Sequence, residues 1–150
     1  MKQMLMVKLG GGVITDKNVH YGLREDVLMR LAREIARGYA KLGESQLIIG
    51  NGAGSFAHFS AHKYRTTEGF IDESSRVGMG WVRHDAVKLN QIVFEQLLLA
   101  NVPVFSYSPS SLMSVSNRTT NFYRVDRGRT QKWNCSLSVW RCSGGRSAWV

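Results

Sequence analysis

The chain has 150 residues and a mass of 16.9 kDa, a length that suits one ordinary domain and argues against a two-domain enzyme. Its hydrophobic fraction of 43% and charged fraction of 21% argue against a disordered or fibrous chain. No apolar run approaches the roughly 20 residues of a membrane span, and the N-terminus lacks the long apolar segment of a signal peptide. We therefore expect a cytoplasmic globular protein.

The first predicted elements are a strand and a helix separated by a glycine loop. Leu5–Val7 has the composition of a short buried strand, and Gly10–Gly12 and the turn residues Asp16–Asn18 follow it. Residues 24–42 are predicted to form a helix, because acidic residues precede an apolar repeat at steps of three and four and Gly43 follows it. The apolar positions of this repeat are Leu28, Leu31, Ile35, Tyr39 and Leu42.

The same pattern then repeats. Gln46–Ile49 is a second predicted strand, Gly50–Gly54 forms a second glycine loop, and Ser55–His58 opens another helix. A longer helix and a third strand at Val102–Tyr107 complete a βαβαβ order. One face of that longer helix carries Val82, Ala86, Leu89, Val93, Leu97 and Ala100.

Alternating strands and helices predict an α/β fold with a mainly parallel sheet covered on both faces. Both glycine loops would lie at the carboxyl ends of strands, which is where ligands bind in open α/β sheets. We find neither a helical period nor a strand alternation from about Asn121, so the predicted domain covers residues 1–120 and residues 121–150 form a separate tail.

The glycine loops are the candidate site. Backbone amides of Gly10–Gly12 are free to converge on an anion, with Lys8 and Lys17 beside them, although a tight turn with two solvated lysines is the alternative. The second loop adds a helix N-terminus, and two such junctions favour a ligand that carries phosphoryl groups. His58 is expected in the first turn of that helix, facing the anion, whereas His62 is interpreted as a surface residue.

Two motifs resemble a known family. Residues 8–17 (KLGGGVITDK) resemble the K-L-G-G-S-x-I-T-x-K opening of isopentenyl phosphate kinases, which are members of the amino acid kinase family, and residues 50–58 (GNGAGSFAH) resemble their G-H-G-G-G-S-F-G-H signature. Residues 89–93, 102–104 and 108–111 are similar to that family's next helix, strand and loop. The resemblance covers about residues 4–120 and implies a three-layer α/β/α sandwich whose C-terminal half is missing here.

The resemblance also implies residue roles for phosphoryl transfer from ATP to isopentenyl phosphate, a step of isoprenoid biosynthesis. The ATP phosphates would be held by Lys8, Gly10, Gly11 and Gly12, with Ala53 and Gly54 beside them. Lys17 would stabilise the transferred phosphoryl group, and Gly52 and His58 would hold the acceptor phosphate. Cations, including Mg²⁺ brought with ATP, would offset the repulsion between the two polyanions. No protein metal ligand is expected.

The sequence departs from the family motifs at four positions, with Gly12 for Ser, Asn51 for the first His, and Ala53 and Ala57 for glycines. Another family member that acts on a phosphate or phosphonate acceptor is the alternative enzyme. The acceptor pocket is expected among residues 64–81, and both a monomer and a homodimer are left open.

The tail differs in composition. Residues 1–120 carry a net charge of +4 and residues 121–150 carry +5, within a formal total of +9. Reading one base later turns each Trp codon of the tail into a Gly codon, and permitted codons from Thr130 then allow L-K-N-G-I-V-P-L-A-Y-G-D-V-V-V-D, which looks like the family's next strand and nucleotide loop. We therefore hypothesise that the tail is out of frame, and we expect poor solubility and little or no kinase activity from this chain.

A nucleic-acid-binding protein is the alternative of a different class, with stacking by tail tryptophans and phosphate contacts by tail cations. Those residues are Trp133, Trp140, Arg124, Arg127, Arg129, Lys132, Arg141 and Arg146. This alternative predicts salt-dependent binding of DNA or RNA that deletion of residues 121–150 abolishes. Cys135 and Cys142 lack histidines at zinc spacing and are interpreted as incidental thiols.

Overall fold

The computed structural model describes residues 4–43, 46–108, 113–116, 119–122 and 136–137. Two parallel strands, β1 (Met4–Leu9) and β2 (Gln46–Asn51), form its centre, paired in register from Met4 opposite Gln46 to Leu9 opposite Asn51. Both strands were predicted, but β2 runs on through Gly50 and Asn51, which the sequence analysis had assigned to the glycine loop. The second turn therefore begins only at Gly52.

Helix α2 (Glu25–Tyr39) connects the two strands. Glu25 and Asp26 lie in its first turn, where the helix dipole favours acidic side chains, and Leu28 and Ala32 are fully buried. The predicted helix of residues 24–42 is confirmed, although it begins at Glu25 and ends at Tyr39, three residues earlier than predicted. Gly43 follows with a φ of 57°, a conformation that few other residues adopt.

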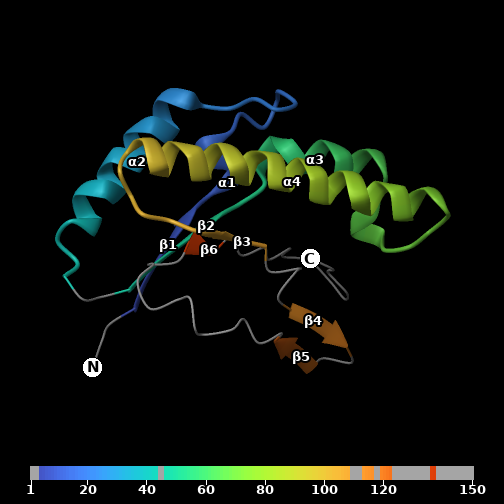
Figure 1. Ribbon diagram of the computed structural model, residues 1–150. Coiled ribbons are helices and arrows are strands. Elements are labelled where there is room, and N and C mark those ends of the chain that lie inside the picture. Colours follow the sequence, from blue (N-terminus) through green and yellow to red (C-terminus); the bar gives the residue numbers. More distant parts are fainter. Residues whose placement is uncertain (1–3, 44–45, 109–112, 117–118, 123–135, 138–150) are drawn as a thin grey trace.

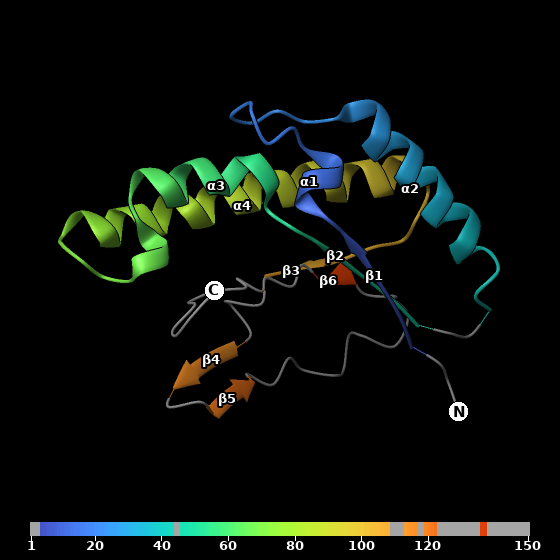
Figure 2. The ribbon, with the colours of Figure 1, turned by 180° about the vertical axis from the view of Figure 1, so that it is seen from behind.

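Helices α3 (Gly54–Lys63) and α4 (Ser74–Leu99) follow β2 and lie side by side, with the short 3-10 turn η1 (Thr66–Glu68) between them (Figures 1 and 2). The predicted apolar face of α4 buries Leu89, Val93 and Leu97, and Asn101 ends the helix with a φ of 60°. A hydrogen bond from the Val102 amide to the Leu97 carbonyl closes the C-terminus of α4. Both helices confirm the prediction.

The expected third strand is shorter than predicted. Residues 102–105 are not part of a strand, although Val102 and Val104 are buried in the core, and β3 comprises only Ser106–Tyr107. β3 pairs in parallel with β6 (Ser136–Leu137), which lies in the tail where no regular element was predicted. β4 (Met113–Ser116) and β5 (Thr119–Phe122) form an antiparallel hairpin.

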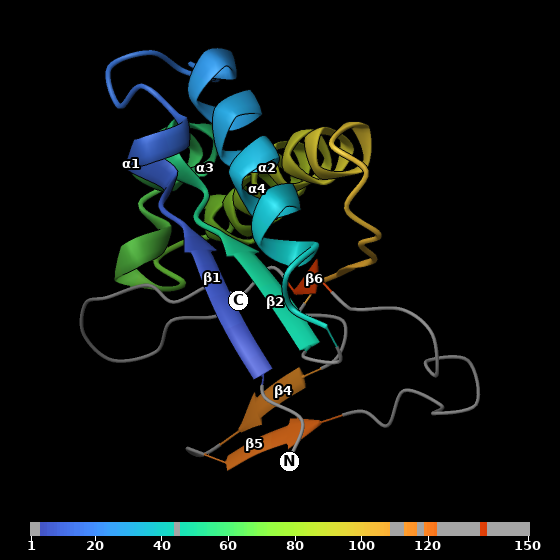
Figure 3. The same cartoon turned by 90° about the vertical axis from the view of Figure 1, so that its left-hand side faces the viewer.

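The described α-helices, including the one-turn α1 (Gly11–Ile14), lie on one side of β1 and β2 (Figures 1 and 3). One core fills the space between this layer and the strands, formed by Leu9, Ile14, Leu28, Ala32, Leu47, Ile49, Phe56, Leu89, Val93, Leu97, Val102 and Val104. The side chains of Met4 and Met6 are 63% and 55% exposed, as alternation along a strand covered on one face requires. The α/β class with parallel strands is confirmed; within the described ranges, no helix covers the opposite face.

Candidate functional site

The two glycine turns meet at the carboxyl ends of β1 and β2. Because Leu9 and Asn51 are register partners, the residues that follow them start side by side. The Gly52 amide donates a 2.8 Å hydrogen bond to the Leu9 carbonyl, which joins the second turn to the end of the first strand. The predicted juxtaposition of the two glycine segments at one edge of the sheet is therefore present.

The contact between the turns is a contact of backbone with backbone. A β-carbon at Gly11 would lie 2.6 Å from the α-carbon of Gly54, and a β-carbon at Gly52 would lie 2.8 Å from the Gly11 nitrogen. Carbon atoms do not approach so closely without a shift of the chain, so only glycine fits at these two positions. The first glycine segment was expected as an open loop, but the structure forms it into the single helical turn α1.

The side chain of Thr15 stabilises this contact between the two turns by hydrogen bonds. Its hydroxyl donates a 2.7 Å hydrogen bond to the Gly11 carbonyl and accepts a 3.0 Å hydrogen bond from the Ser55 amide. The residue is fully buried, and Gly54 lies beside it with a φ of 50°. Sequence reasoning did not single out Thr15. The signal that was available is its place in the motif of residues 8–17.

The two lysines lie at different distances from the turns. The Cε atom of Lys17 lies 3.0 Å from the point where a β-carbon at Gly12 would be, so this side chain lies along the first turn. Lys8 is exposed near the end of β1, two residues before Gly10. Neither lysine has an ion-pair partner within the described part of the chain. Among the described residues, no carboxylate competes with an anion for either ammonium group.

Ala53 fits where the family motif has glycine. It is 4% exposed and has a φ of −72° and a ψ of −22°, which are ordinary right-handed values for any residue. The left-handed conformation falls on Gly54 instead. The methyl group of Ala53 thus causes no backbone strain in the second turn.

His58 was expected in the first turn of α3, but it is the fifth residue of that helix and begins the second turn. It is exposed and makes no hydrogen bond among the described residues. His62, one turn later, is exposed as well. Only proximity to the glycine turn distinguishes the two histidines, because the N-terminus of α3 lies closer to His58.

A buried carboxylate that the sequence analysis missed lies on α4. Asp85 is 1% exposed, accepts a 2.6 Å hydrogen bond from the Tyr21 hydroxyl and another from Ser60, and lies 2.9 Å from Nδ1 of His84. Burial alone would raise the pKa of Asp85, but the hydrogen bonds from Ser60, Tyr21 and His84 outweigh it and lower that pKa. The signal in the sequence was a carboxylate four residues before Leu89, on the apolar face of the helix.

A second polar chain joins β2, α4 and β3. Ser106 donates a 2.7 Å hydrogen bond to Asn90 Oδ1, and Asn90 Nδ2 donates a 2.8 Å hydrogen bond to Asn51 Oδ1. Asn51, which stands where the family motif has histidine, is 2% exposed. These bonds fix the end of β2 directly before the second turn.

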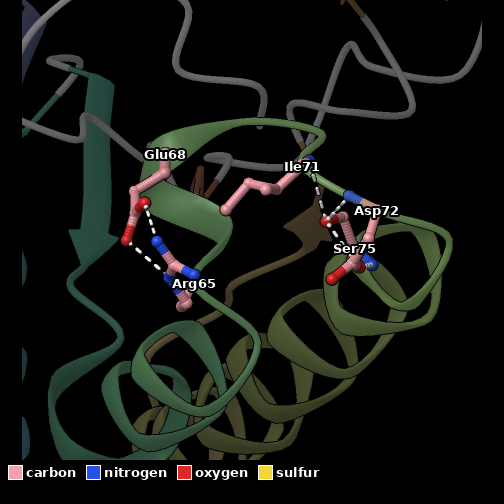
Figure 4. A network of polar contacts seen from close by, with 5 residues as sticks. All are labelled: Arg65, Glu68, Ile71, Asp72 and Ser75. Atoms are coloured by element: carbon pink, nitrogen blue, oxygen red, sulfur yellow. Dashed lines mark hydrogen bonds and ion pairs between the residues drawn. The ribbon is translucent and has the colours of Figure 1, made fainter.

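Residues 64–81, where an acceptor pocket was expected, form η1, a loop and the first turns of α4. Arg65 Nε donates a 2.9 Å hydrogen bond to Glu68, and Ser75 Oγ accepts one of 3.1 Å from the Ile71 amide (Figure 4). The loop is thus held by local polar contacts. Four large apolar side chains of residues 64–81 are exposed, two in the loop and two on α4, namely Phe70, Ile71, Val77 and Trp81.

Among the described residues, no helix has the length and apolar character that crossing a membrane requires. The same residues contain no group of three or more His, Cys, Asp or Glu that could hold a metal ion. The predictions made for Cys135, Cys142, the tail cations and the tail tryptophans lie outside the described residues.

Comparisons with known proteins identify relatives of this chain. A sequence model of the amino acid kinase family matches residues 3–134. The isopentenyl phosphate kinase of Methanothermobacter thermautotrophicus is 35% identical over 139 residues, and that of Methanocaldococcus jannaschii is 34% identical over 118 residues. These alignments cover 89% and 73% of this chain.

A crystal structure of an isopentenyl phosphate kinase has a similar fold, with a TM-score of 0.75 and 29% identity over 91% of this chain. The match covers 56% of that structure, and the two sequence matches cover 47% and 45% of the Methanothermobacter and Methanocaldococcus enzymes. The chain therefore spans about half the length of the relatives it matches.

Proposed function

Because the chain belongs to the amino acid kinase family, we propose that its paired glycine turns hold the phosphates of ATP and of a phosphate acceptor. In the complete protein this site would catalyse ATP-dependent phosphorylation of isopentenyl phosphate to isopentenyl diphosphate, since the curated relatives carry that name. The observation that carries the proposal is the direct backbone contact between Gly11 and Gly54, with Lys17 lying along the same turn.

The proposed roles follow the position of each residue. Lys17 is the cation for the transferred phosphoryl group, because its side chain lies over the first turn. Gly52 and His58 bind the acceptor phosphate near the start of α3. The ATP phosphates are assigned to Lys8, Gly10, Gly11, Gly12, Ala53 and Gly54.

The site fits the phosphate chain of ATP. Phosphate oxygens accept hydrogen bonds from backbone amides, and glycine leaves those amides open to close approach. The glycines let the two turns pack backbone against backbone at the carboxyl ends of the strands, and two lysines without ion-pair partners among the described residues lie beside them. The described carboxylates form no metal cage, so Mg²⁺ would enter on the ATP phosphates and supply neutralising charge there.

Chemistry at this site requires orientation and positive charge more than a base. The acceptor oxygen of a phosphate monoester is already ionised, so no side chain has to remove its proton. The turns align the two phosphates, and Lys17 offsets the repulsion between them, as electrostatic stabilisation of phosphoryl transfer requires. His58 acts as a hydrogen-bond donor that orients the acceptor.

Binding is the direct test, because this chain spans about half the length of the relatives it matches. Calorimetric titration with isopentenyl phosphate should show binding that His58→Ala weakens about tenfold, the loss of one charged hydrogen bond. His62→Ala is the matched control, since it removes another exposed histidine, one turn further from the glycines. Equal losses in both variants, or no binding by the unmodified chain, would contradict the proposal.

The acceptor hydrocarbon is proposed to contact the exposed apolar side chains of residues 64–81. Phe70 and Trp81 are 62% and 46% exposed, and water-exposed aromatic surface gains free energy when a hydrocarbon covers it. Isopentenyl phosphate should therefore bind more tightly than methyl phosphate, and Trp81→Ala should reduce that difference. A phosphonate acceptor would not require this apolar surface.

The tail is proposed to be out of frame over part of residues 121–150. Its Trp-rich, basic composition supports this, and the family match that ends at residue 134 favours a change of frame close to Thr130. Sequencing the encoding DNA from the Asn117 codon onward tests the proposal. A frame one base later that stays open through Y-G-D supports it, and early closure of that frame refutes it.

Location and assembly complete the proposal. ATP and a phosphorylated acceptor are water-soluble anions, so we place the enzyme in the cytoplasm. Sedimentation velocity of the purified chain would distinguish a monomer from a homodimer.

A further inference from the structure

The loop that carries Lys17 contains a strained residue. Residues 15–24 leave α1 and return to it, closed at the base by a bridge between Thr15 and Leu23 and by a 2.7 Å hydrogen bond from the Asp16 amide to the Gly22 carbonyl. Tyr21 lies near the end of this loop with a φ of 58°. A bulky residue rarely adopts this left-handed conformation, and it persists only where surrounding contacts determine it.

Four contacts determine the conformation of Tyr21. Its hydroxyl donates a 2.6 Å hydrogen bond to Asp85, and its ring packs edge-on against buried Phe56 with centroids 5.0 Å apart. The Lys88 ammonium lies 3.9 Å from the ring centroid, and the His20 ring stacks at 3.9 Å. The loop is therefore fastened to α3 and α4, which are distant from it in the sequence.

Asp85 is a rigid anchor for this contact. It is fully buried on α4, and Ser60 on α3 binds its other oxygen. The carboxylate thus joins both helices to the loop at one point. A surface carboxylate would not hold the tyrosine so firmly, because water would compete for the hydroxyl.

The position of the Lys17 side chain depends on these contacts of Tyr21. Lys17 lies in the same closed loop as Tyr21, and its exposed side chain lies along the first glycine turn, so the position of that side chain follows from the backbone position that the loop gives it. No ion pair within the described ranges holds its ammonium group in place. The loop backbone is what remains to set the position of that ammonium group.

We propose that Asp85 and Tyr21 are positioning residues for Lys17: the hydrogen bond from Tyr21 to the buried carboxylate holds the loop of residues 15–24 so that the Lys17 ammonium lies over the first glycine turn. The role of Lys17 as a cation for the phosphoryl group rests on the function proposed above. The mechanical link from Asp85 to Lys17 is independent of it and applies to the ligand-free chain.

The test compares Tyr21→Phe with Ser60→Ala. Tyr21→Phe removes only the hydroxyl that binds Asp85 Oδ1, whereas Ser60→Ala removes the hydrogen bond to Oδ2 of the same carboxylate and leaves the loop contact intact. Two measurements are made on each chain without ligand: amide hydrogen exchange of residues 16–22, and the rate at which an acylating reagent modifies Lys17, with exposed Lys41 as the internal reference. Protection of Lys17 by ATP with Mg²⁺ is then measured separately.

Tyr21→Phe should speed exchange in residues 16–22 about tenfold, the equivalent of one lost charged hydrogen bond. It should also bring the modification rate of Lys17 to that of Lys41 and weaken the protection by ATP. Ser60→Ala leaves the bond from Tyr21 to Asp85 in place, so it should change each of the three measurements less than Tyr21→Phe does. If Asp85 only stabilised the fold, Tyr21→Phe and Ser60→Ala should change the three measurements to the same extent.

Unchanged exchange and unchanged Lys17 modification in Tyr21→Phe would overturn the inference, as would equal changes in the two variants. ATP that fails to protect Lys17 in the unmodified chain would overturn the proposed function instead. In that case the two ligand-free measurements still decide whether Asp85 and Tyr21 position Lys17. The two failures are therefore distinguishable.

Discussion

Asn90 of α4 donates a 2.8 Å hydrogen bond to the side-chain oxygen of Asn51, the last residue of β2. The two residues are 39 positions apart, and Ser106 extends the chain of hydrogen bonds to β3. The start of the second glycine turn is therefore fixed from the middle of a helix that follows it in sequence. A turn held in this way is preorganised before a ligand arrives.

Asn90→Ala should destabilise the chain by about 1–3 kcal/mol, because it leaves the buried Asn51 oxygen without a donor. Asn90→Asp is the informative companion, since a carboxylate has nearly the same shape but cannot donate to Asn51. Urea denaturation followed by circular dichroism measures both changes. If Asn90→Asp keeps the stability of the unmodified chain, this hydrogen bond does not contribute.

Gly54→Ala should destabilise by roughly 1–3 kcal/mol, because Gly54 has a φ of 50° and a new β-carbon would lie 2.8 Å from the Gly11 carbonyl oxygen. Gly38→Ala is the control of opposite sign. Gly38 lies inside α2 with nothing within 4 Å of a new β-carbon, so alanine there should stabilise by about 0.5–1 kcal/mol. The same urea titrations provide the comparison, and a neutral Gly54→Ala would show that the turn backbone can yield.

Asp85 should make the free energy of unfolding depend on pH in the acidic range. Its pKa is lowered in the folded chain, where hydrogen bonds from Ser60, Tyr21 and His84 outweigh the opposing effect of burial, whereas an unfolded aspartate titrates near about 3.9. Below that pH the unfolded chain takes up the proton first, so the contribution of Asp85 is present at neutral pH and is lost as the pH falls through the folded pKa. Asp85→Asn should remove this part of the acid dependence, which unfolding experiments below about pH 5 measure.

Tyr21 should give the corresponding effect at alkaline pH. The hydrogen bond to Asp85, burial and the charge of Asp85 raise its pKa from 10.0 to about 12. Between these values the unfolded tyrosine ionises while the folded one stays neutral, so stability is full below pH 10 and decreases as the pH approaches 12. The tyrosinate absorbance of the folded chain should show one late-titrating group that Tyr21→Phe removes. Five tyrosines titrating together would contradict the assignment.

The sequence was sufficient for the order of the first elements and for the place of the candidate site. Both are local properties: the spacing of Leu28, Leu31 and Ile35 predicts α2, and a strand followed by glycines marks each turn. Local sequence patterns did not predict the extent of the third strand, because that extent depends on pairing with another strand. Residues 102–105 are apolar enough for a strand, yet only Ser106 and Tyr107 find a partner strand.

What only the tertiary structure decided is how distant side chains complete the site. The contacts of Tyr21 with Asp85, of Thr15 with Ser55, and of Asn90 with Asn51 join residues 64, 40 and 39 positions apart. No periodicity encodes such pairs, because each residue type is equally compatible with solvent at its own position. Burying a polar group without a partner costs free energy, so groups such as the Asp85 carboxylate pair with donors that the fold brings near them, and the packing of α3 and α4 against the glycine turns decides which donors these are.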